Sequence, residues 1–121
     1  MNAEEVLKRF AVMADLSLEE SSPWVDFCAD AAEDILLQLK DGVDIEANER
    51  RLTSAAASLS FYRYTLYRAS GEGMNSFSVG DVKVTQNKKD SVNSAYQAWC
   101  NQRDNISDLI EDDHFLFRMV E

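Results

Sequence analysis

The sequence predicts a mainly α-helical fold: a small bundle of about four helices, with a short β-hairpin before the last helix and an extended C-terminal tail. Three observations predict it. The 121 residues fit one domain, residues 1–121. Four glycines and one proline leave few breakers for a many-turned β fold. Apolar residues recur at three- and four-residue steps over most of the chain.

The first helix is expected over about residues 3–14. Asn2 can cap its N-terminus, and Glu5 stands three residues later, which is the spacing of a capping box. An apolar stripe that includes Val6 and Phe10 follows helical spacing. Residues 15–21 are expected to form a loop.

The second helix has the strongest start signal. Ser22 is a suitable N-cap, and Pro23 at the first helical position has no N–H to leave unpaired. Apolar residues from Trp24 to Leu39 then recur at helical spacing, with acidic residues on the other face. Gly42 suits a left-handed turn at the C-terminal end.

A longer third helix is expected over about residues 45–69, capped by Asp44. Residues 61–68 place aromatic side chains all round this helix. One face can join the core, so Tyr64 and Tyr67, followed by Arg68, are predicted to point elsewhere as anchors at a protein interface. The alternative is that these side chains pack under neighbouring loops.

Residues 77–85 carry the β signal, because two alternating runs flank a Gly-Asp pair of the kind that a type II′ hairpin turn requires. A lone hairpin is marginal in water, so it must lie on the helices or pair with a neighbouring chain. Its candidate protein contacts are Phe77, Val79, Gly80, Asp81, Val82 and Val84.

The fourth helix is expected over about residues 88–111, and the last segment, 114–121, is expected to be a strand or an extended arm. This tail is apolar, whereas free termini are usually polar and frayed. It either covers the core of its own domain or docks on another subunit. Its candidate contacts are Phe115, Leu116, Phe117 and Met119.

The net charge of −10 disfavours nucleic-acid binding, which depends on Lys and Arg neutralising phosphates, and anionic membranes would repel the chain too. Cys28 and Cys100 lack metal or redox spacing and are expected to be reduced thiols. The N-terminus lacks the basic and apolar regions of a signal peptide, and no window approaches a membrane span. We therefore expect a protein made and kept in a cytoplasm.

Catalytic patterns are weak. His114 follows Asp112 and Asp113, but this neighbouring set is neither a triad nor a spaced metal site. The Gly71-Glu72-Gly73 run is too short for a phosphate loop. We expect no enzyme activity and no cofactor.

Three segments in order carry a family resemblance: FYRYTLYRAS, then FSVGDVKVT, then DDHFLFRMV at the end. Over residues 61–120 the chain resembles the head–tail connector, or head-completion adaptor, proteins of tailed bacteriophages and prophages. The first half matches only as short helices.

This resemblance implies a helical virion subunit, made in the bacterial host cytoplasm, that forms a homo-oligomeric ring, a dodecamer in the family. The ring would join the portal protein to a neck or tail-completion protein, and DNA would pass through it without specific binding. Acids lining the bore would keep DNA from sticking. The alternative is a small acidic helical module that regulates or inhibits one host or phage protein.

Overall fold

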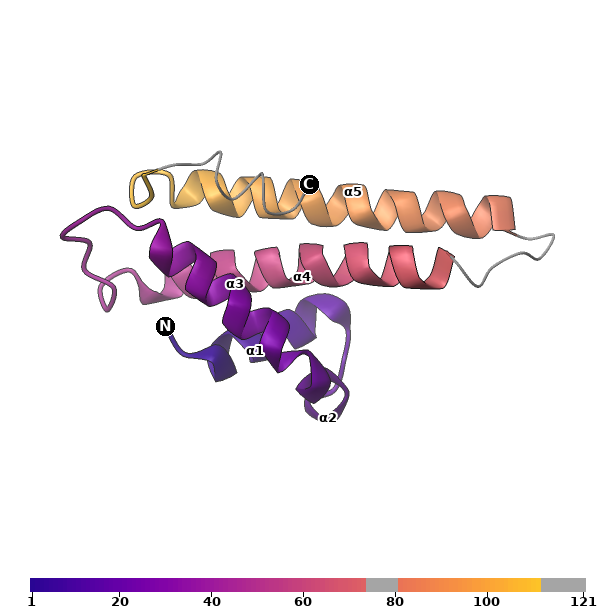
Figure 1. The fold of residues 1–121 in the computed structure, drawn as a ribbon, viewed down its shortest axis with the longest axis horizontal. Coiled ribbons are helices and arrows are strands. Elements are labelled where there is room, and N and C mark those ends of the chain that lie inside the picture. The colour runs from indigo at the N-terminus through magenta and orange to yellow at the C-terminus, as the bar shows by residue number, and fades with distance from the viewer. Residues whose placement is uncertain (74–80, 112–121) are drawn as a thin grey trace.

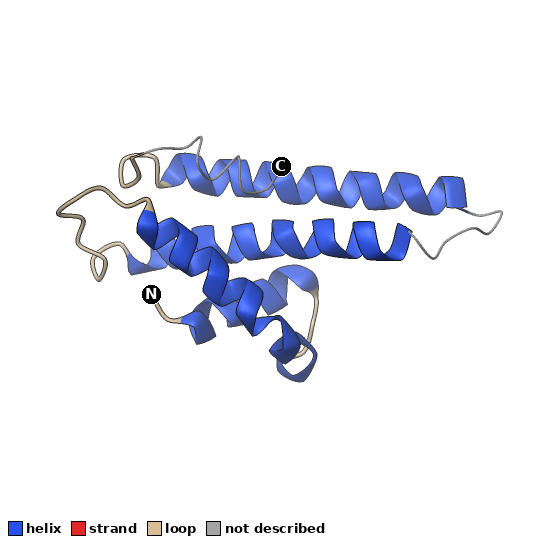
Figure 2. Cartoon of the chain, viewed as in Figure 1, coloured by secondary structure: helices blue, strands red, loops and turns tan. Residues whose placement is uncertain are grey.

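The computed structural model describes the backbone of residues 1–73 and 81–111, and the side chains of residues 1–69 and 90–111. The prediction of a mainly helical fold is confirmed, and the described residues contain no β-strand (Figure 2). In chain order the elements are α1 (Ala3–Ala14), α2 (Leu18–Ser21), the 3-10 turn η1 (Ser22–Trp24), α3 (Val25–Leu37), α4 (Glu49–Gly73) and α5 (Asp81–Asn105).

The start and end of α1 follow from its capping residues. Asn2 Oδ1 accepts a hydrogen bond from the Glu4 backbone N–H at 2.8 Å, which satisfies one of the free donors of the first turn. At the other end Asp15 adopts the left-handed conformation, with φ 56°, and its N–H bonds back into the helix. The predicted bounds of this helix are confirmed.

The predicted loop over residues 15–21 is wrong in its second half, because Leu18–Ser21 forms α2. Ser17 Oγ accepts from the Glu20 N–H, and Glu20 Oε1 accepts from the Ser17 N–H, each at 3.0 Å. This reciprocal pair is a complete capping box, which stabilises even a single helical turn. Pro23 then sits at the start of η1, where its missing N–H is harmless.

The connection between α3 and α4 is longer than predicted. Gly42 has φ 84°, as its left-handed turn requires, but α3 already ends at Leu37 and α4 begins at Glu49. Asp44 Oδ1 accepts from the Ala47 N–H at 3.1 Å, so Asp44 caps an isolated turn before α4.

The predicted hairpin is wrong in its second strand. Asp81, Val82 and Val84 belong to α5, which starts seven positions earlier than the predicted 88 and ends at Asn105. Residues 81–105 contain no glycine or proline, and pairing with α4 outweighs the marginal stability of a two-residue-turn hairpin. Residues 77–80 lie outside the described residues, as does the tail 114–121.

The helices form two layers (Figure 1). The antiparallel pair of α4 and α5 makes one layer, and α1 and α3 pack on α4 to make the other. The core lies between the layers, and its largest fully buried side chains include Trp99, Phe10, Ile35 and Leu59. Small residues 55–57 are also buried, which lets neighbouring helices approach α4 closely.

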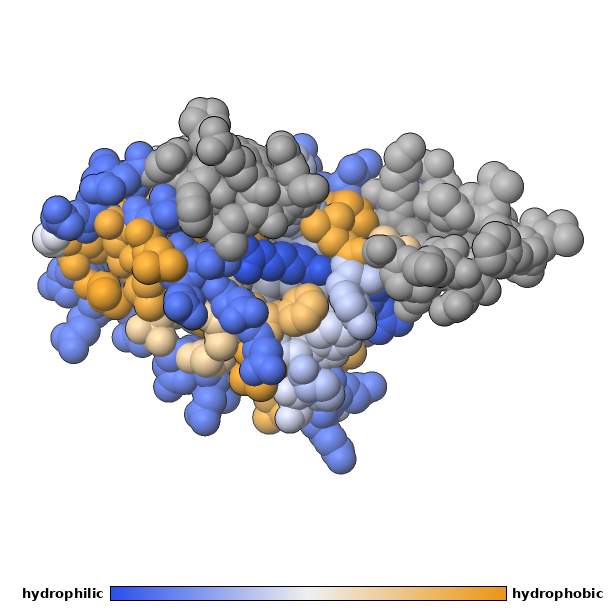
Figure 3. Space-filling view, viewed as in Figure 1, coloured by the Kyte–Doolittle hydropathy of each residue, from blue (hydrophilic) through white to orange (hydrophobic). Residues whose placement is uncertain are grey.

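One end of the molecule is tied together by backbone hydrogen bonds. Leu39 and Ile110 form an isolated antiparallel bridge, in which the Lys40 N–H donates to the Leu109 carbonyl and the Glu111 N–H donates to the Gln38 carbonyl, each at 2.8 Å. The exit of α3 is thereby fixed to the segment that follows α5. Figure 3 shows a hydrophobic area at the end where the α3–α4 connection lies. Leu37, the last residue of α3, and Ile45, within the connection, are both exposed.

The opposite end is a two-helix projection, which we call the arm. Each of α4 and α5 contains 25 residues, which corresponds to about 37 Å. The C-terminal end of α4 and the start of α5 extend beyond α1, α2 and α3 (Figure 1). The second layer therefore covers only part of the pair.

Candidate functional site

Tyr64, a predicted interface anchor, is part of the core. Its side chain is 7% exposed, and its ring meets Phe10 and Trp24 edge to face at centroid distances of 5.2 and 4.8 Å. Because α1 and α3 both pack on α4, two faces of α4 are buried rather than one. The prediction that Tyr64 points away from the core is wrong for this reason.

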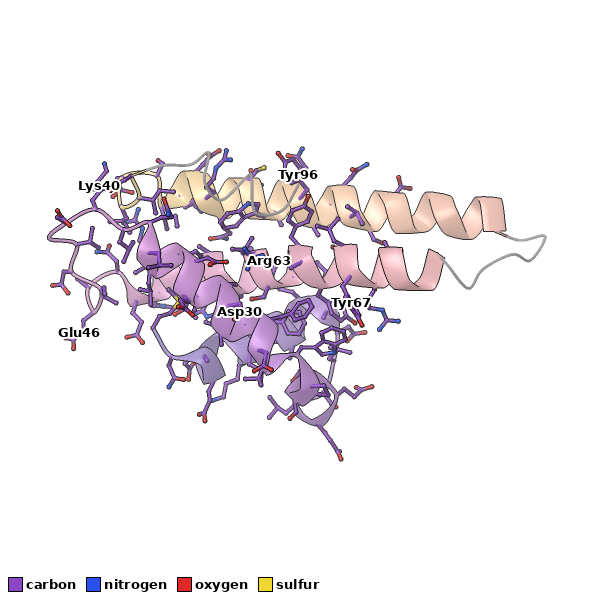
Figure 4. The ribbon with its side chains drawn as sticks, viewed as in Figure 1. Asp30, Lys40, Glu46, Arg63, Tyr67 and Tyr96 are labelled. Atoms are coloured by element: carbon purple, nitrogen blue, oxygen red, sulfur yellow. The ribbon has the colours of Figure 1, made fainter. Side chains whose placement is uncertain are left out.

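Tyr67 lies one turn later, and its side chain is 60% exposed. One side of its ring packs against Trp24 and Phe27, at centroid distances of 5.6 and 5.8 Å. Figure 4 shows Tyr67 at the root of the arm, where the second layer ends. A half-packed aromatic ring is held in place with little loss of freedom on binding, which suits a contact residue.

Arg68 contacts Tyr64 from the surface. It is exposed, its Nη1 donates to the Tyr64 hydroxyl at 3.1 Å, and its guanidinium carbon lies 5.6 Å from the centre of the Tyr64 ring. The Arg68 side chain thus closes the polar end of a buried aromatic cluster. Its predicted role as a residue of a protein interface stays a prediction.

Exposed apolar side chains also occur on the elements next to Tyr67. Val12 at the end of α1 is 81% exposed, Leu18 on α2 is 64% exposed, and Val25 begins α3 half exposed. The elements α1, α2, η1 and α3 contact one another in sequence order. The described residues therefore expose apolar side chains near Tyr67 as well as at the α3–α4 connection, where Leu37 and Ile45 are exposed.

Of the remaining predicted contacts, the structure describes only the backbone of Asp81, Val82 and Val84. Asp81, Val82 and Val84 are residues of the first turns of α5, at the distal end of the arm. Phe77, Val79 and Gly80 lie outside the described residues, and so do the tail residues Phe115, Leu116, Phe117 and Met119.

Sequence reasoning missed two ion pairs that join elements. Arg63 on α4 meets Asp34 on α3 at 2.8 Å, with both side chains largely buried (Figure 4). Arg51, near the start of α4, meets Asp108 beyond the end of α5 at 2.6 Å. Neither pair has a local sequence signal, because the partners are far apart in the chain.

The described residues offer little for catalysis. Residues 1–69 and 90–111 contain no group of three or more histidine, cysteine, aspartate or glutamate side chains placed to hold a metal ion. Cys28 is buried, and burial raises the pKa of its thiol, which keeps the sulfur protonated and unreactive near neutral pH. His114 lies outside the described residues.

None of the described helices combines the length and apolar character that a membrane span requires. Comparison of the chain with protein-family models, with curated proteins and with solved structures finds no match.

Proposed function

We propose that this chain is a structural subunit of a tailed bacteriophage or prophage virion, a head–tail connector that assembles into a ring. The single observation that carries an assembly role is the arm. The two helices, each about 37 Å long in full, extend side by side beyond the second layer, which covers only part of the pair. A helix pair gains stability when a third element covers its groove, and a neighbouring subunit is the cover available in a ring.

The contact residues of this proposal lie along the arm. Tyr67 supplies an exposed aromatic ring at its root, and Val82 and Val84 lie in the first turns of α5 at its distal end. Phe77, Val79 and Gly80 lie between the two helices in sequence and outside the described residues. We assign the tail residues 115–119 to a second contact, with the same or the next ring.

The partners follow from the sequence resemblance over residues 61–120. The ring, a dodecamer in this family, would bind the portal protein on one side and a neck or tail-completion protein on the other. The net charge of −10 supports a conduit that lets DNA pass without holding it, since phosphates are repelled by carboxylates. The site of function would be the neck of the virion.

Light scattering on the purified chain, alone and mixed with portal rings, tests this proposal. We expect a ring alone or a ring bound to portal. Tyr67→Ala is expected to weaken assembly, whereas Ala29→Ser, an exposed change on α3, is the matched control. A strict monomer that ignores portal rings contradicts the proposal, and a tight one-to-one complex with a single other protein would instead support a regulatory module.

A further inference from the structure

Three arginines gather where α1, α4 and α5 meet. They line a hollow of about 390 Å³ together with three neutral polar residues: Arg9, Arg50, Arg51, Ser54, Gln102 and Asn105. Every one of these side chains carries hydrogen-bond donors, and none of the described lining residues is a carboxylate. Such a concentration of cations is unexpected on a chain with a net charge of −10.

The three arginines differ in the hydrogen bonds and ion pairs that their guanidinium groups already make. Arg9 Nη1 donates to Ser54 Oγ at 2.8 Å. Arg51 pairs with Asp108, and also donates to Asn48 Oδ1 and to the Asn105 carbonyl. Arg50 is exposed, and within residues 1–69 and 90–111 its guanidinium makes no ion pair or hydrogen bond. The hollow thus contains positioned donors with unused capacity.

The placement of Arg50 and Arg51 also opposes the helix dipole. Both lie in the first turn of α4, where the free backbone N–H groups carry positive partial charge and where cations are unfavourable. A residue choice that weakens a helix end is expected where another interaction compensates for it. Asp108 compensates for Arg51, and a bound anion would do the same for Arg50.

We propose that this hollow binds a phosphate group, either inorganic phosphate or the phosphate of a small monoester. Asp108 neutralises Arg51, which leaves Arg9 and Arg50 to balance the two negative charges of a phosphate. A carboxylate carries one negative charge and two acceptor oxygens, fewer than a phosphate does. Phosphate also has enough acceptor oxygens to bond the guanidinium groups and Ser54 together.

The neighbouring carboxylates limit how tightly the hollow is expected to bind phosphate. Glu5, Glu46 and Glu49 line an adjoining hollow of about 610 Å³ that shares the three arginines. Glu5 is held near Lys8 at 3.6 Å. These carboxylates lower the local positive potential, so we expect dissociation constants near the millimolar range, roughly 4 kcal/mol of binding free energy. Binding should weaken as salt rises.

NMR titration of the full chain with inorganic phosphate tests the site, in a phosphate-free buffer held at constant ionic strength with chloride. We expect saturable shifts of the backbone resonances of Arg50, Ser54 and Asn105. Arg50→Ala should weaken phosphate binding about tenfold, corresponding to ~1.4 kcal/mol, and Arg50→Lys should recover part of it. Lys88→Ala, which removes a cation about 20 Å along α5 from Gln102, is the control that should leave binding unchanged.

Two further titrations identify the ligand. Glycerol phosphate tests a monoester, and whichever phosphate binds more tightly identifies the source of the group. Acetate tests a carboxylate, and acetate binding as tight as phosphate would overturn the proposal. The same holds if no saturable shift occurs, or if Arg50→Ala binds phosphate as the original chain does. Ring assembly is not needed for this site, so its failure leaves the connector proposal standing.

Discussion

Arg63 and Asp34 form a salt bridge in a setting where few charges are found. Their side chains are only 17% and 16% exposed, and their nearest nitrogen and oxygen lie 2.8 Å apart. The pair joins α3 to α4. A buried pair adds little net stability over apolar residues, but losing one partner leaves the other charge without compensation.

Asp34→Ala is therefore expected to lower the free energy of unfolding by about 2 to 3 kcal/mol, since the Arg63 charge stays partly buried without its partner. Urea unfolding followed by circular dichroism measures this change. Asp30→Ala, one turn earlier on the exposed side of α3, should change stability by less than about 0.5 kcal/mol. Equal losses in the two variants would show that the ion pair has no special role.

Asp108 gives the fold a dependence on acid. The hydrogen bond from Arg51 lowers the pKa of Asp108 below its ordinary value of 3.8. A folded-state pKa below the unfolded one means that the stabilisation is complete above the unfolded pKa and is lost as pH falls through the folded pKa.

Asp108→Asn should accordingly lower Tm by a constant amount above about pH 5, and the difference from the original chain should shrink as pH falls below the unfolded pKa. Thermal unfolding of both chains, followed over a pH series from above pH 5 to below the unfolded-state pKa, measures this difference in Tm. Asp104→Asn, whose carboxylate lies near Arg103 instead, is the matched control. A Tm difference that stays constant down to the most acidic pH would exclude this linkage.

At the scale of the helices, α4 is central because it contacts α1, α3 and α5. This is possible because residues 55–57 are alanines with almost no exposed surface. Small side chains let helix axes approach, and they also make the packing intolerant of larger ones.

Ala56→Leu should thus cost about 1 to 3 kcal/mol of unfolding free energy through overpacking. Ala29→Leu places the same side chain on the exposed face of α3 and should be close to neutral. Urea unfolding of both variants compares the two positions. If Ala56→Leu were tolerated as well as Ala29→Leu, the conclusion that neighbouring helices pack closely against Ala56 would be wrong.

The sequence predicted helix positions where local chemistry decides them. The cap at Asn2 and the apolar periodicity act within one or two turns, and α1 follows them closely. The predicted cap at Ser22 is wrong, because Ser22 and Pro23 form the 3-10 turn η1 and α3 starts only at Val25. The capping box of Ser17 and Glu20 was also visible, but a four-residue helix gives no periodicity to support it. The hairpin failed because its alternating pattern was outweighed by pairing with α4, a tertiary effect.

The candidate sites were harder to predict than the helices. Tyr64 and Tyr67 are three positions apart, yet one is buried and one exposed, which depends on how many helices pack on α4. The arginine hollow combines Arg9 with Arg50 and residues of α5, and only the fold brings them together. The neighbouring pair of Arg50 and Arg51 in an acidic chain was its one sequence signal.

For the whole molecule, charge opposes assembly. In the proposed ring each chain would have a net charge of −10, so neighbours would repel one another, and screening would shorten the range of that repulsion from about 10 Å at 0.1 M salt to about 3 Å at 1 M. If the ring is held by apolar contacts along the arm, raising sodium chloride should increase the oligomer fraction. Light scattering across a salt series measures it, and dissociation at high salt would point to ion pairs instead.

The bridge between Leu39 and Ile110 makes one end of the α4–α5 pair different from the other. It fixes Ile110, just beyond α5, at one end of the α4–α5 pair, and the end of α4 and the start of α5 lie at the other end, about 37 Å along the helix. The proposed ring would join its subunits front to back, so that every subunit points the same way. A particle built this way has a top and a bottom, so each of its two sides can recognise a different neighbour.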